Sequence, residues 1–334
     1  MQTSVIKLTD LVLKSSREYL DQNNYTEVVT PRIVRASGAC ENVNTLFEVS
    51  SDKNDKWFNG HKSYLAQTGQ LYLEALVPKL GSVYCVGPSF RAEQKVDNRH
   101  LTEFLMIEIE HAGGFDQLLQ YIEGMLKHIA KCIVRTAESA GTVDISTENI
   151  SRLTGCPKVF TKYTYDQAIT RLIGLGEKLE WGDDISSAQE RLLVQANGNQ
   201  PLFITRFPDP MWTFEKEIEV EKFFNMLPDP ENPGRVLSAD LILPFGGEAV
   251  GSAARAHTAE VLTSRLENSR MYKRLLERGG SMADFDWYIN QVKTNGAIPH
   301  AGCGFGMARV IQWLMGEADI RNAVAFPSNK EVLI

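Results

Sequence analysis

The stretch from Phe90 to Glu110, FRAEQKVDNRHLTEFLMIEIE, constrains the fold of this chain more than any other. Strand-like segments at 83–93 and 100–111 flank a polar loop at 94–99, and this pattern predicts an antiparallel hairpin. The stretch also carries three Arg or His side chains and five carboxylates. Charges buried in a sheet are costly unless something pairs with them. We therefore expect the hairpin to face a ligand that carries both charge signs.

The spacing of the charged residues places several of them on one face. Side chains two residues apart share a face of a strand, so Arg91 and Glu93 point the same way. On the returning strand, Phe104, Glu108 and Glu110 share a face. Arg can grip a phosphate in fork geometry, an aromatic ring can stack on a purine, and a carboxylate can accept from an amine. These are the parts of a nucleotide site, although a surface hairpin with solvated ion pairs would explain the same residue types.

Hydrophobic periodicity predicts the other elements. Helices are expected at 4–23, 70–80, 115–139, 258–278 and 282–294, and strands at 28–29, 201–207, 236–243 and 248–254. A glycine-rich strand and a final helix are expected over 302–315. Adjacent hairpins with helices placed later favour an α+β fold, in which helices flank a mostly antiparallel sheet. Alternating βαβ units are not evident.

Composition excludes several classes of protein. The chain of 334 residues is 43% hydrophobic and 23% charged, as in ordinary soluble globular proteins. It has no apolar run of about 18 residues and no secretory signal, so we expect a cytoplasmic protein without a membrane span. The five cysteines lack a CxxC pair and do not cluster with the six histidines, which argues against disulfides and a zinc site. The net charge of −7 argues against a broad nucleic-acid-binding face.

A second charged element is SADLILPFGGEAVGSAAR, residues 238–255. Asp240 interrupts an apolar strand and Glu248 follows two glycines. Two carboxylates in this setting can hold Mg²⁺ through hard oxygen ligands, although a polar strand end and a turn would explain them too. Strict alternation from Glu248 sends Arg255 to the opposite face, so the strand must end or bulge before it.

The third element is PHAGCGFGMARVIQWLMG, residues 299–316. Gly302, Gly304 and Gly306 alternate along one strand face, where glycines let a ligand lie close to the backbone. Arg309 follows in the first turn of the final helix, and a helix N-terminus already favours anions. A glycine-rich strand packed tightly under a helix would have the same sequence.

Taken in this order, the three elements resemble the signature motifs of class II aminoacyl-tRNA synthetases, and most closely the asparaginyl branch. EVVTPRI (27–33) resembles motif 1, FRAEQKVDNRHLTEF resembles motif 2, and GFGMAR (304–309) resembles motif 3. SGACENVNTLFEV (37–49) is similar to the substrate-closing loop. The pieces WGDDI, ERL and ITRFP also recur in that family. The likeness covers essentially the whole chain.

The resemblance implies a class II catalytic domain with a six- or seven-stranded antiparallel sheet, forming a homodimer through motif 1. The catalytic pair would be Arg91, on the α-phosphate of ATP, and Arg309, on the γ-phosphate and the base. Mg²⁺ would be held by Asp240 and Glu248. The implied ATP-binding set is Arg91, Glu93, Arg99, His100, Leu101, Phe104, Asp240, Glu248, Gly306 and Arg309. The implied amino-acid-binding set is Ser37, Glu41, Gln67, Gln70, Glu108, Ser252, Arg255, His300 and Gly302.

Some positions distinguish the asparaginyl branch from the aspartyl one, and others depart from the family pattern. Leu73 and Glu108 are asparaginyl-like, since aspartyl enzymes typically have Lys and Asp there. Ala308 stands where motif 3 usually has an acidic residue, and Ser252-Ala253 replaces the usual Gly-Ser. Motif 1 begins near residue 27, so we expect residues 1–334 to be a single catalytic domain without the anticodon-binding barrel. The missing barrel and the negative net charge argue against tRNA as a partner.

Stand-alone archaeal asparagine synthetases related to these enzymes have the same arrangement. By that likeness, the chain would adenylate aspartate with ATP and pass the acyl group to ammonia, giving asparagine and AMP. The side-chain carboxylate must then be activated, so aspartate would bind end-for-end, with Arg255 on its α-carboxylate. Its ammonium group would need Glu41, Gln70 or Glu108.

Three alternatives stay open. The chain can be an asparaginyl-tRNA synthetase-like enzyme that charges tRNA, or a biosynthetic amide or ester ligase that uses an aminoacyl-adenylate on another acceptor. It can also be an inactive paralogue that binds a partner or senses an amino acid. Retention of the ATP-binding set argues against the last alternative, because an inactive protein does not need it.

Overall fold

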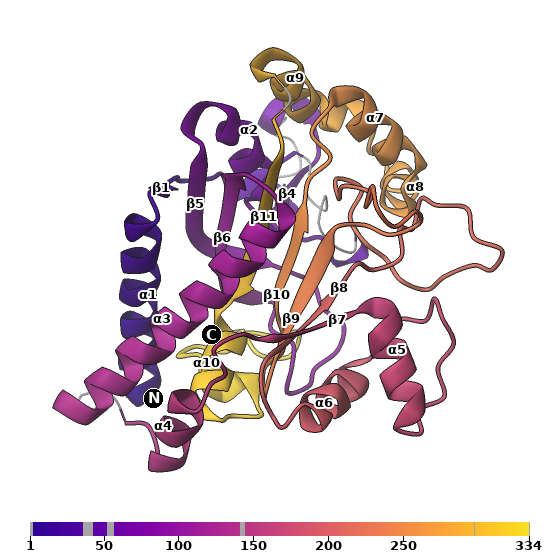
Figure 1. Ribbon diagram of the computed structural model, residues 1–334. Coiled ribbons are helices and arrows are strands. Elements are labelled where there is room, and N and C mark those ends of the chain that lie inside the picture. The colour runs from indigo at the N-terminus through magenta and orange to yellow at the C-terminus, as the bar shows by residue number, and fades with distance from the viewer. Residues whose placement is uncertain (1–2, 36–42, 52–56, 141–143, 297, 334) are drawn as a thin grey trace.

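The computed structural model describes residues 3–35, 43–51, 57–140, 144–296 and 298–333. Figure 1 shows a twisted central sheet with helices against it. Its strands lie in the order β1-β5-β6-β11-β10-β9-β8-β7. Their bounds are β1 (Thr26–Glu27), β5 (Ser82–Phe90), β6 (Glu103–Ala112), β7 (Thr161–Thr164), β8 (Leu202–Thr205), β9 (Ser238–Leu243), β10 (Gly247–Ala254) and β11 (His300–Gly306).

The predicted α+β architecture is confirmed, with a correction to the sheet. Six neighbouring strands pair in antiparallel fashion, in the order β5, β6, β11, β10, β9 and β8. β1 joins β5 and β7 joins β8 in parallel, so the sheet has eight strands instead of six or seven. A separate three-stranded sheet has the order β2-β4-β3, with β2 (Ile33–Val34), β3 (Glu48–Val49) and β4 (Ser63–Leu65).

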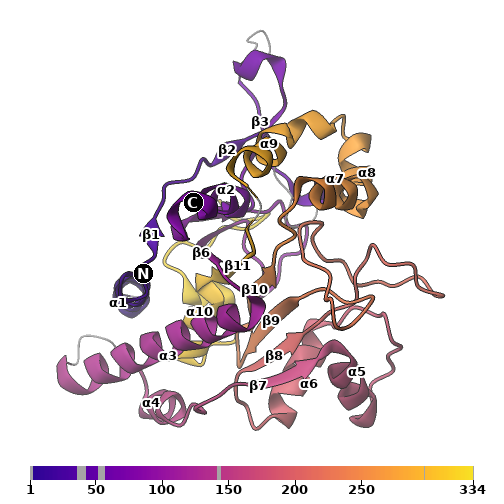
Figure 2. The same ribbon diagram turned by 45° about the horizontal axis from the view of Figure 1, so that its top comes forward.

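Ten α-helices occur in the described part of the chain. They are α1 (Thr3–Gln22), α2 (Gln70–Leu80), α3 (Phe115–Ala140), α4 (Thr147–Thr154), α5 (Tyr165–Gly174), α6 (Ser187–Ala196), α7 (Ala259–Asn268), α8 (Arg270–Glu277), α9 (Asp286–Asn295) and α10 (Met307–Met315). Short 3₁₀ turns lie at Val43–Thr45, Trp57–Gly60, Met282–Asp284 and Ile320–Ala323. Figure 2 shows α7, α8 and α9 grouped at one end of the molecule, with α5 and α6 beside β7 and β8. Within the described ranges, no helix is both long and apolar enough to cross a membrane.

The main core lies between the sheet and its longest helix. α3 packs on β10, β11 and α1, and its apolar side chains recur every three or four residues, as in Leu118, Ile122, Leu126 and Ile129. All four are fully buried. This helical spacing puts them on one face, so their burial stabilises the sheet from that side.

Several element boundaries differ from expectation, three of them as follows. The first hairpin strand ends at Phe90 instead of residue 93, because the amide of Ala92 bonds the carbonyl of Thr45 (2.7 Å) and leaves the hairpin ladder. The expected helix 258–278 is two helices, because Ser269 is extended and its side chain caps α8. The strand expected at 28–29 is also wrong, since β1 occupies Thr26–Glu27.

The sequence predicts that Cys and His side chains do not cluster, and this prediction is wrong at one place. His128 and Cys132 lie one turn apart on α3, with 3.6 Å between Nε2 and Sγ. Glu18 of α1 approaches the same Nε2 to 3.5 Å. The sequence hides this cluster, because Glu18 comes from another helix. Here its contacts link α1 to α3.

Candidate functional site

A cavity of about 400 Å³ opens over the middle of the sheet. Its floor is formed by side chains of β6, β9 and β10 and by Gly304 and Gly306 of β11. It is lined by all ten residues of the predicted ATP-binding set. The five predicted amino-acid-binding residues that line it are Gln67, Gln70, Glu108, Ser252 and Arg255.

Two predicted amino-acid-binding residues do not line this cavity. His300 is buried below it and faces Glu74, with 3.5 Å between Nε2 and Oε2. A side chain at Gly302 would come within 2.0 Å of the Glu110 carboxyl group, so this glycine makes room for Glu110 and not for a ligand. Ser37 and Glu41 lie outside the described residues.

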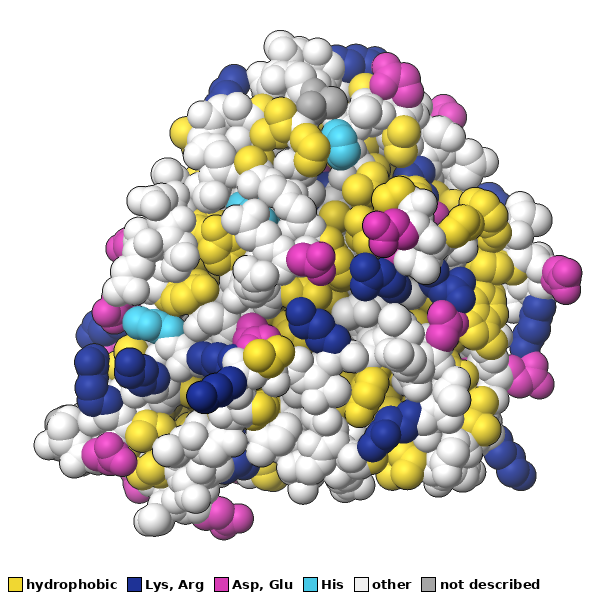
Figure 3. Space-filling model, viewed as in Figure 1, with side chains coloured by type: hydrophobic (Ala, Val, Ile, Leu, Met, Phe, Trp, Pro, Cys, Tyr) yellow, Lys and Arg dark blue, Asp and Glu magenta, His cyan; other side chains and the backbone are white. Residues whose placement is uncertain are grey.

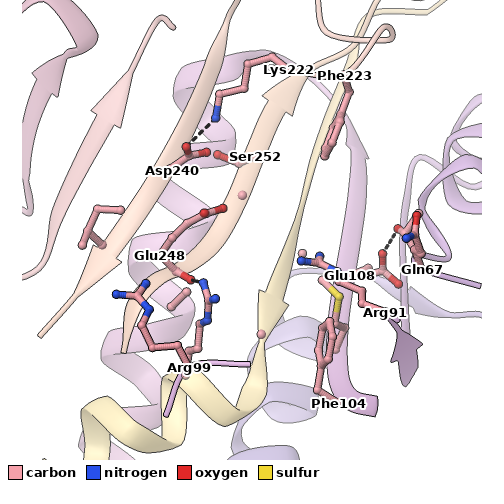
Figure 4. Close-up of a pocket in the computed structure, with 18 of the residues that line it drawn as sticks. Gln67, Arg91, Arg99, Phe104, Glu108, Lys222, Phe223, Asp240, Glu248 and Ser252 are labelled. Carbon is pink, nitrogen blue, oxygen red and sulfur yellow. Dashed lines mark hydrogen bonds and ion pairs between the residues drawn. The ribbon is translucent and has the colours of Figure 1, made fainter. Parts of the chain in front are cut away.

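Two arginines predicted to act together line the same cavity. The guanidinium carbon of Arg91 lies 5.1 Å from the centroid of the Phe104 ring (Figure 4). Arg309 donates a hydrogen bond to the carbonyl of Glu248. Burial lowers the pKa of Arg309, although the nearby carboxylates of Glu248 and Glu190 act in the opposite direction. The cavity therefore offers two cationic groups, one just after β5 and one in α10, which are distant in sequence.

The two predicted metal ligands come together across neighbouring strands. Asp240 on β9 is the register partner of Gly251 on β10. A side chain at Gly251 would lie 3.4 Å from the Glu248 carboxylate, so Glu248 reaches over this glycine toward Asp240 (Figure 4). Burial raises the pKa of Asp240 to about 7, against the effect of the Lys222 ammonium. These hard oxygen donors fit Mg²⁺.

A bulge explains how Glu248 and Arg255 can both line the cavity. The register of β10 with β9 shifts between Glu248 and Val250. This extra residue changes the alternation, so that Glu248 and Arg255, seven positions apart, face the same side. The predicted strand irregularity is confirmed.

A buried polar network lies beneath the other end of the cavity. Arg255 donates to Glu110 Oε1 from Nε (3.0 Å) and Nη2 (2.8 Å), and also to the carbonyl of Gly302 (2.9 Å). Gln70 donates to the same Oε1 at 3.1 Å. Complete burial raises the pKa of Glu110 to about 8, although Arg255 opposes this shift.

Two more carboxylates lie in this region: Glu74, whose Oε1 is 3.8 Å from Arg255 Nε, and Glu108, which lines the cavity. Glu74 accepts from Asn225 Nδ2 at 2.7 Å and from Tyr288 Oη at 2.5 Å. Glu108 accepts from the amide of Gly69 at 2.8 Å and from the hydroxyl of Thr68. These contacts fix both carboxylates in position.

Several lining residues escaped prediction. Lys222 and Phe223 lie in an irregular segment rich in Glu, which has no periodic signal. Asp184 and Glu190 fall in WGDDI and ERL, which carried the resemblance without assigned roles. Glu190 accepts from Arg99 at 3.2 Å, and burial raises its pKa. Glu74, which does not line the cavity, had one signal, namely a carboxylate in the middle of the mostly apolar helix α2.

The surface charge agrees with the overall composition. On the face in Figure 3, Lys and Arg side chains are interspersed with acidic and apolar ones. In the cavity, by contrast, charged side chains of both signs are gathered around one space.

Comparison with known proteins gives a consistent result. Residues 1–330 match the family model described as tRNA synthetases class II (D, K and N). The chain is 32% identical over 328 residues to an asparagine–tRNA ligase of Pelotomaculum thermopropionicum, covering 98% of this chain and 69% of that protein. It is 33% identical to the corresponding ligase of Desulforamulus reducens, with the same coverage of 98% and 69%.

Solved structures show the same likeness. Asparaginyl-tRNA synthetase from Pyrococcus horikoshii, complexed with asparaginyl-adenylate, superposes with a TM-score of 0.82 at 28% identity, covering 99% of this chain and 69% of that one. The Entamoeba histolytica enzyme, also in complex with asparaginyl-adenylate, gives a TM-score of 0.79 at 27% identity, with coverages of 98% and 68%.

Proposed function

This chain belongs to the class II tRNA synthetases (D, K and N), and we propose that it activates asparagine with ATP, forming asparaginyl-adenylate and pyrophosphate. An aminoacyl-tRNA synthetase-like, ATP-dependent ligase is the activity that its relatives share. The observation that best supports the proposal is the convergence of Arg91, Arg309, Asp240 and Glu248 on one cavity. We call the part near these residues and Phe104 the nucleotide end, and the part near Gln70, Glu108 and Arg255 the amino-acid end.

The reaction joins the amino-acid carboxylate to the α-phosphorus of ATP. A carboxylate oxygen forms the new P–O bond, and the bond between the α-phosphorus and the bridging oxygen breaks to release pyrophosphate. Arg91 would neutralise the charge that develops on the α-phosphate, and Arg309 would hold the leaving end. Asp240 and Glu248 would hold Mg²⁺, whose charge would shield the phosphate oxygens. Binding both reactants in one cavity supplies the rest of the rate gain through orientation.

The amino-acid end favours a neutral side chain over a carboxylate. Arg255 is already engaged by Glu110, and Glu108 adds a further acid that faces the cavity. A substrate carboxylate would meet this acidic environment, whereas an amide can donate to a carboxylate and accept from Arg255. This charge pattern supports asparagine in preference to aspartate.

The acceptor is proposed to be tRNA, as the names of the relatives indicate for those proteins. The expected synthesis of asparagine from aspartate and ammonia has less support, because the comparisons favour the synthetase-like alternative. The homodimer, the single-domain organisation and the cytoplasmic location stay predictions.

Amino-acid-dependent exchange of pyrophosphate into ATP tests the activation step. Asparagine should support exchange much better than aspartate, and Arg91→Ala should lower it by about 10³-fold. Adding tRNA or ammonium to the full reaction then identifies the acceptor. Asparaginyl-tRNA is the expected product. Exchange with aspartate alone, together with asparagine and AMP formed from ammonium, would replace the proposal with the ammonia-dependent reaction.

A further inference from the structure

Lys222 contacts a carboxylate that is proposed to bind the metal. It lies in the irregular connection between β8 and β9 and extends into the cavity, with only 14% of its side chain exposed. Its Nζ donates to Asp240 Oδ2 at 2.6 Å and lies 3.7 Å from the centroid of the Phe207 ring. Figure 4 shows the Lys222 ammonium group against the Asp240 carboxylate, with Glu248 on the other side of Asp240.

The charges around Lys222 explain why an ammonium group is stable there. Carboxylates of Asp240, Glu248 and Asp184 all attract Lys222. Two other cations of this region have different contacts, since Arg99 pairs with Glu190 and Arg309 donates to a backbone carbonyl. Within the described ranges, Lys222 is therefore the cation in hydrogen-bond contact with Asp240.

In this arrangement Lys222 opposes a divalent cation at Asp240, although it does not occupy every lone pair of the carboxylate. Mg²⁺ needs its oxygen ligands at about 2.1 Å in near-octahedral geometry. An ammonium group that donates to Oδ2 competes for that lone-pair region and repels the metal. Lysine has a flexible four-carbon stem that lets the charge move without moving the backbone.

We propose that Lys222 is a resident counter-ion of Asp240 and Glu248, which weakens binding of a divalent cation until the nucleotide arrives. When the cation enters with the triphosphate, the ammonium group transfers from Asp240 to a phosphate oxygen. This inference rests on the proposed function for the identity of the nucleotide. Its first step, competition between Lys222 and a cation, concerns the protein without nucleotide.

The test is direct binding of Mn²⁺ to the full chain without nucleotide, measured by electron paramagnetic resonance of the free ion. Wild-type protein should bind weakly. Lys222→Met keeps the stem and removes the charge, so its Mn²⁺ affinity should rise about tenfold or more. Lys222→Arg keeps the charge and should stay near the wild-type value. The double variant K222M/D240N should lose the gain, which shows that the ion uses Asp240.

Equal Mn²⁺ affinity in wild type and K222M would overturn the proposal, as would a gain that survives in K222M/D240N. If K222M does not fold, as judged by circular dichroism, Lys222→Gln provides the same neutral comparison. A purely structural ion pair would lower the melting temperature on substitution without raising Mn²⁺ affinity. Because no nucleotide is present, this result is independent of whether asparagine-dependent exchange is observed.

Discussion

At the nucleotide end, Arg91, Arg309 and Lys222 reach the cavity from three separate segments. At the amino-acid end, Arg255 is buried with Glu110, which is held in turn by Gln70. A bound triphosphate and its cation would rearrange the contacts of the charged groups at the nucleotide end. The network of Arg255, Glu110 and Gln70 is held by contacts within the protein before any ligand arrives. Substitutions at the nucleotide end should therefore reduce activity more than stability, and those under the amino-acid end should reduce stability first.

The largest expected effect tests the nucleotide end. Arg91→Ala should lower asparagine-dependent exchange by about 10³-fold, on the order of 4 kcal/mol in the barrier, because charge on the α-phosphate is no longer neutralised. The melting temperature should change little. Arg171→Ala, at an exposed position on α5, is the matched control and should retain full exchange. A large loss of stability in R91A would contradict the contrast between the two ends.

Two glycines of β11 provide the next comparison. Gly302→Ala would place a methyl group 2.0 Å from the Glu110 carboxyl group, and should lower the free energy of unfolding by about 3 kcal/mol through overpacking. Gly306→Ala has its nearest neighbour, the Ala249 carbonyl, at 3.6 Å, so its stability should remain near that of wild type. Denaturant unfolding measures both. Equal stabilities of the two variants would show that the buried network tolerates displacement.

A pH dependence of stability should originate under the amino-acid end. Burial raises the pKa of Glu110 from 4.5 to about 8, so the folded state holds this proton more tightly than the unfolded chain. The resulting stabilisation is complete below pH 4.5 and is lost as the pH rises through 8. Glu110 should thus make the free energy of unfolding on the order of 3 kcal/mol smaller at pH 8 than at pH 5.

Glu110→Gln should remove this contribution to the change of the free energy of unfolding with pH. Glu267→Gln, at an exposed position on α7, should keep it. Unfolding curves of the three proteins at the two pH values measure the difference. If the free energy of unfolding of E110Q changes with pH as much as that of wild type, other groups cause the pH dependence.

The smallest effect concerns the aromatic ring of the nucleotide end. Phe104→Leu removes the contact with Arg91 and the predicted stacking surface, which should weaken ATP binding by about 1 kcal/mol, or several-fold in KM. The KM for asparagine should not change. A change confined to asparagine would place the ring at the opposite end of the cavity.

Much of this site could be predicted because its residues lie in short, distinctive segments. The hairpin and the glycine-rich strand each carry several lining residues in a periodic pattern, so Arg91, Phe104 and Gly306 are identifiable from sequence. The bulge in β10 was also predictable, because Glu248 and Arg255 have the wrong spacing to share a face.

Contacts made by irregular segments or between separate helices could not be predicted in this way. Lys222 has no periodic environment, and its partner Asp240 is defined only by tertiary packing. The link between Glu74 and His300 likewise joins a helix to a distant strand. The family resemblance alone assigns His300 to the ligand, whereas the fold turns it toward Glu74.

The central claim is that one cavity binds the nucleotide and the amino acid together, with Arg91 and Arg309 on the phosphates. A crystal structure of the protein after incubation with ATP, Mg²⁺ and asparagine tests it most directly. We expect an asparaginyl-adenylate whose phosphate contacts Arg91 and whose amide lies between Glu108 and Arg255. An adenylate or nucleotide bound elsewhere, with these side chains unengaged, would contradict the account.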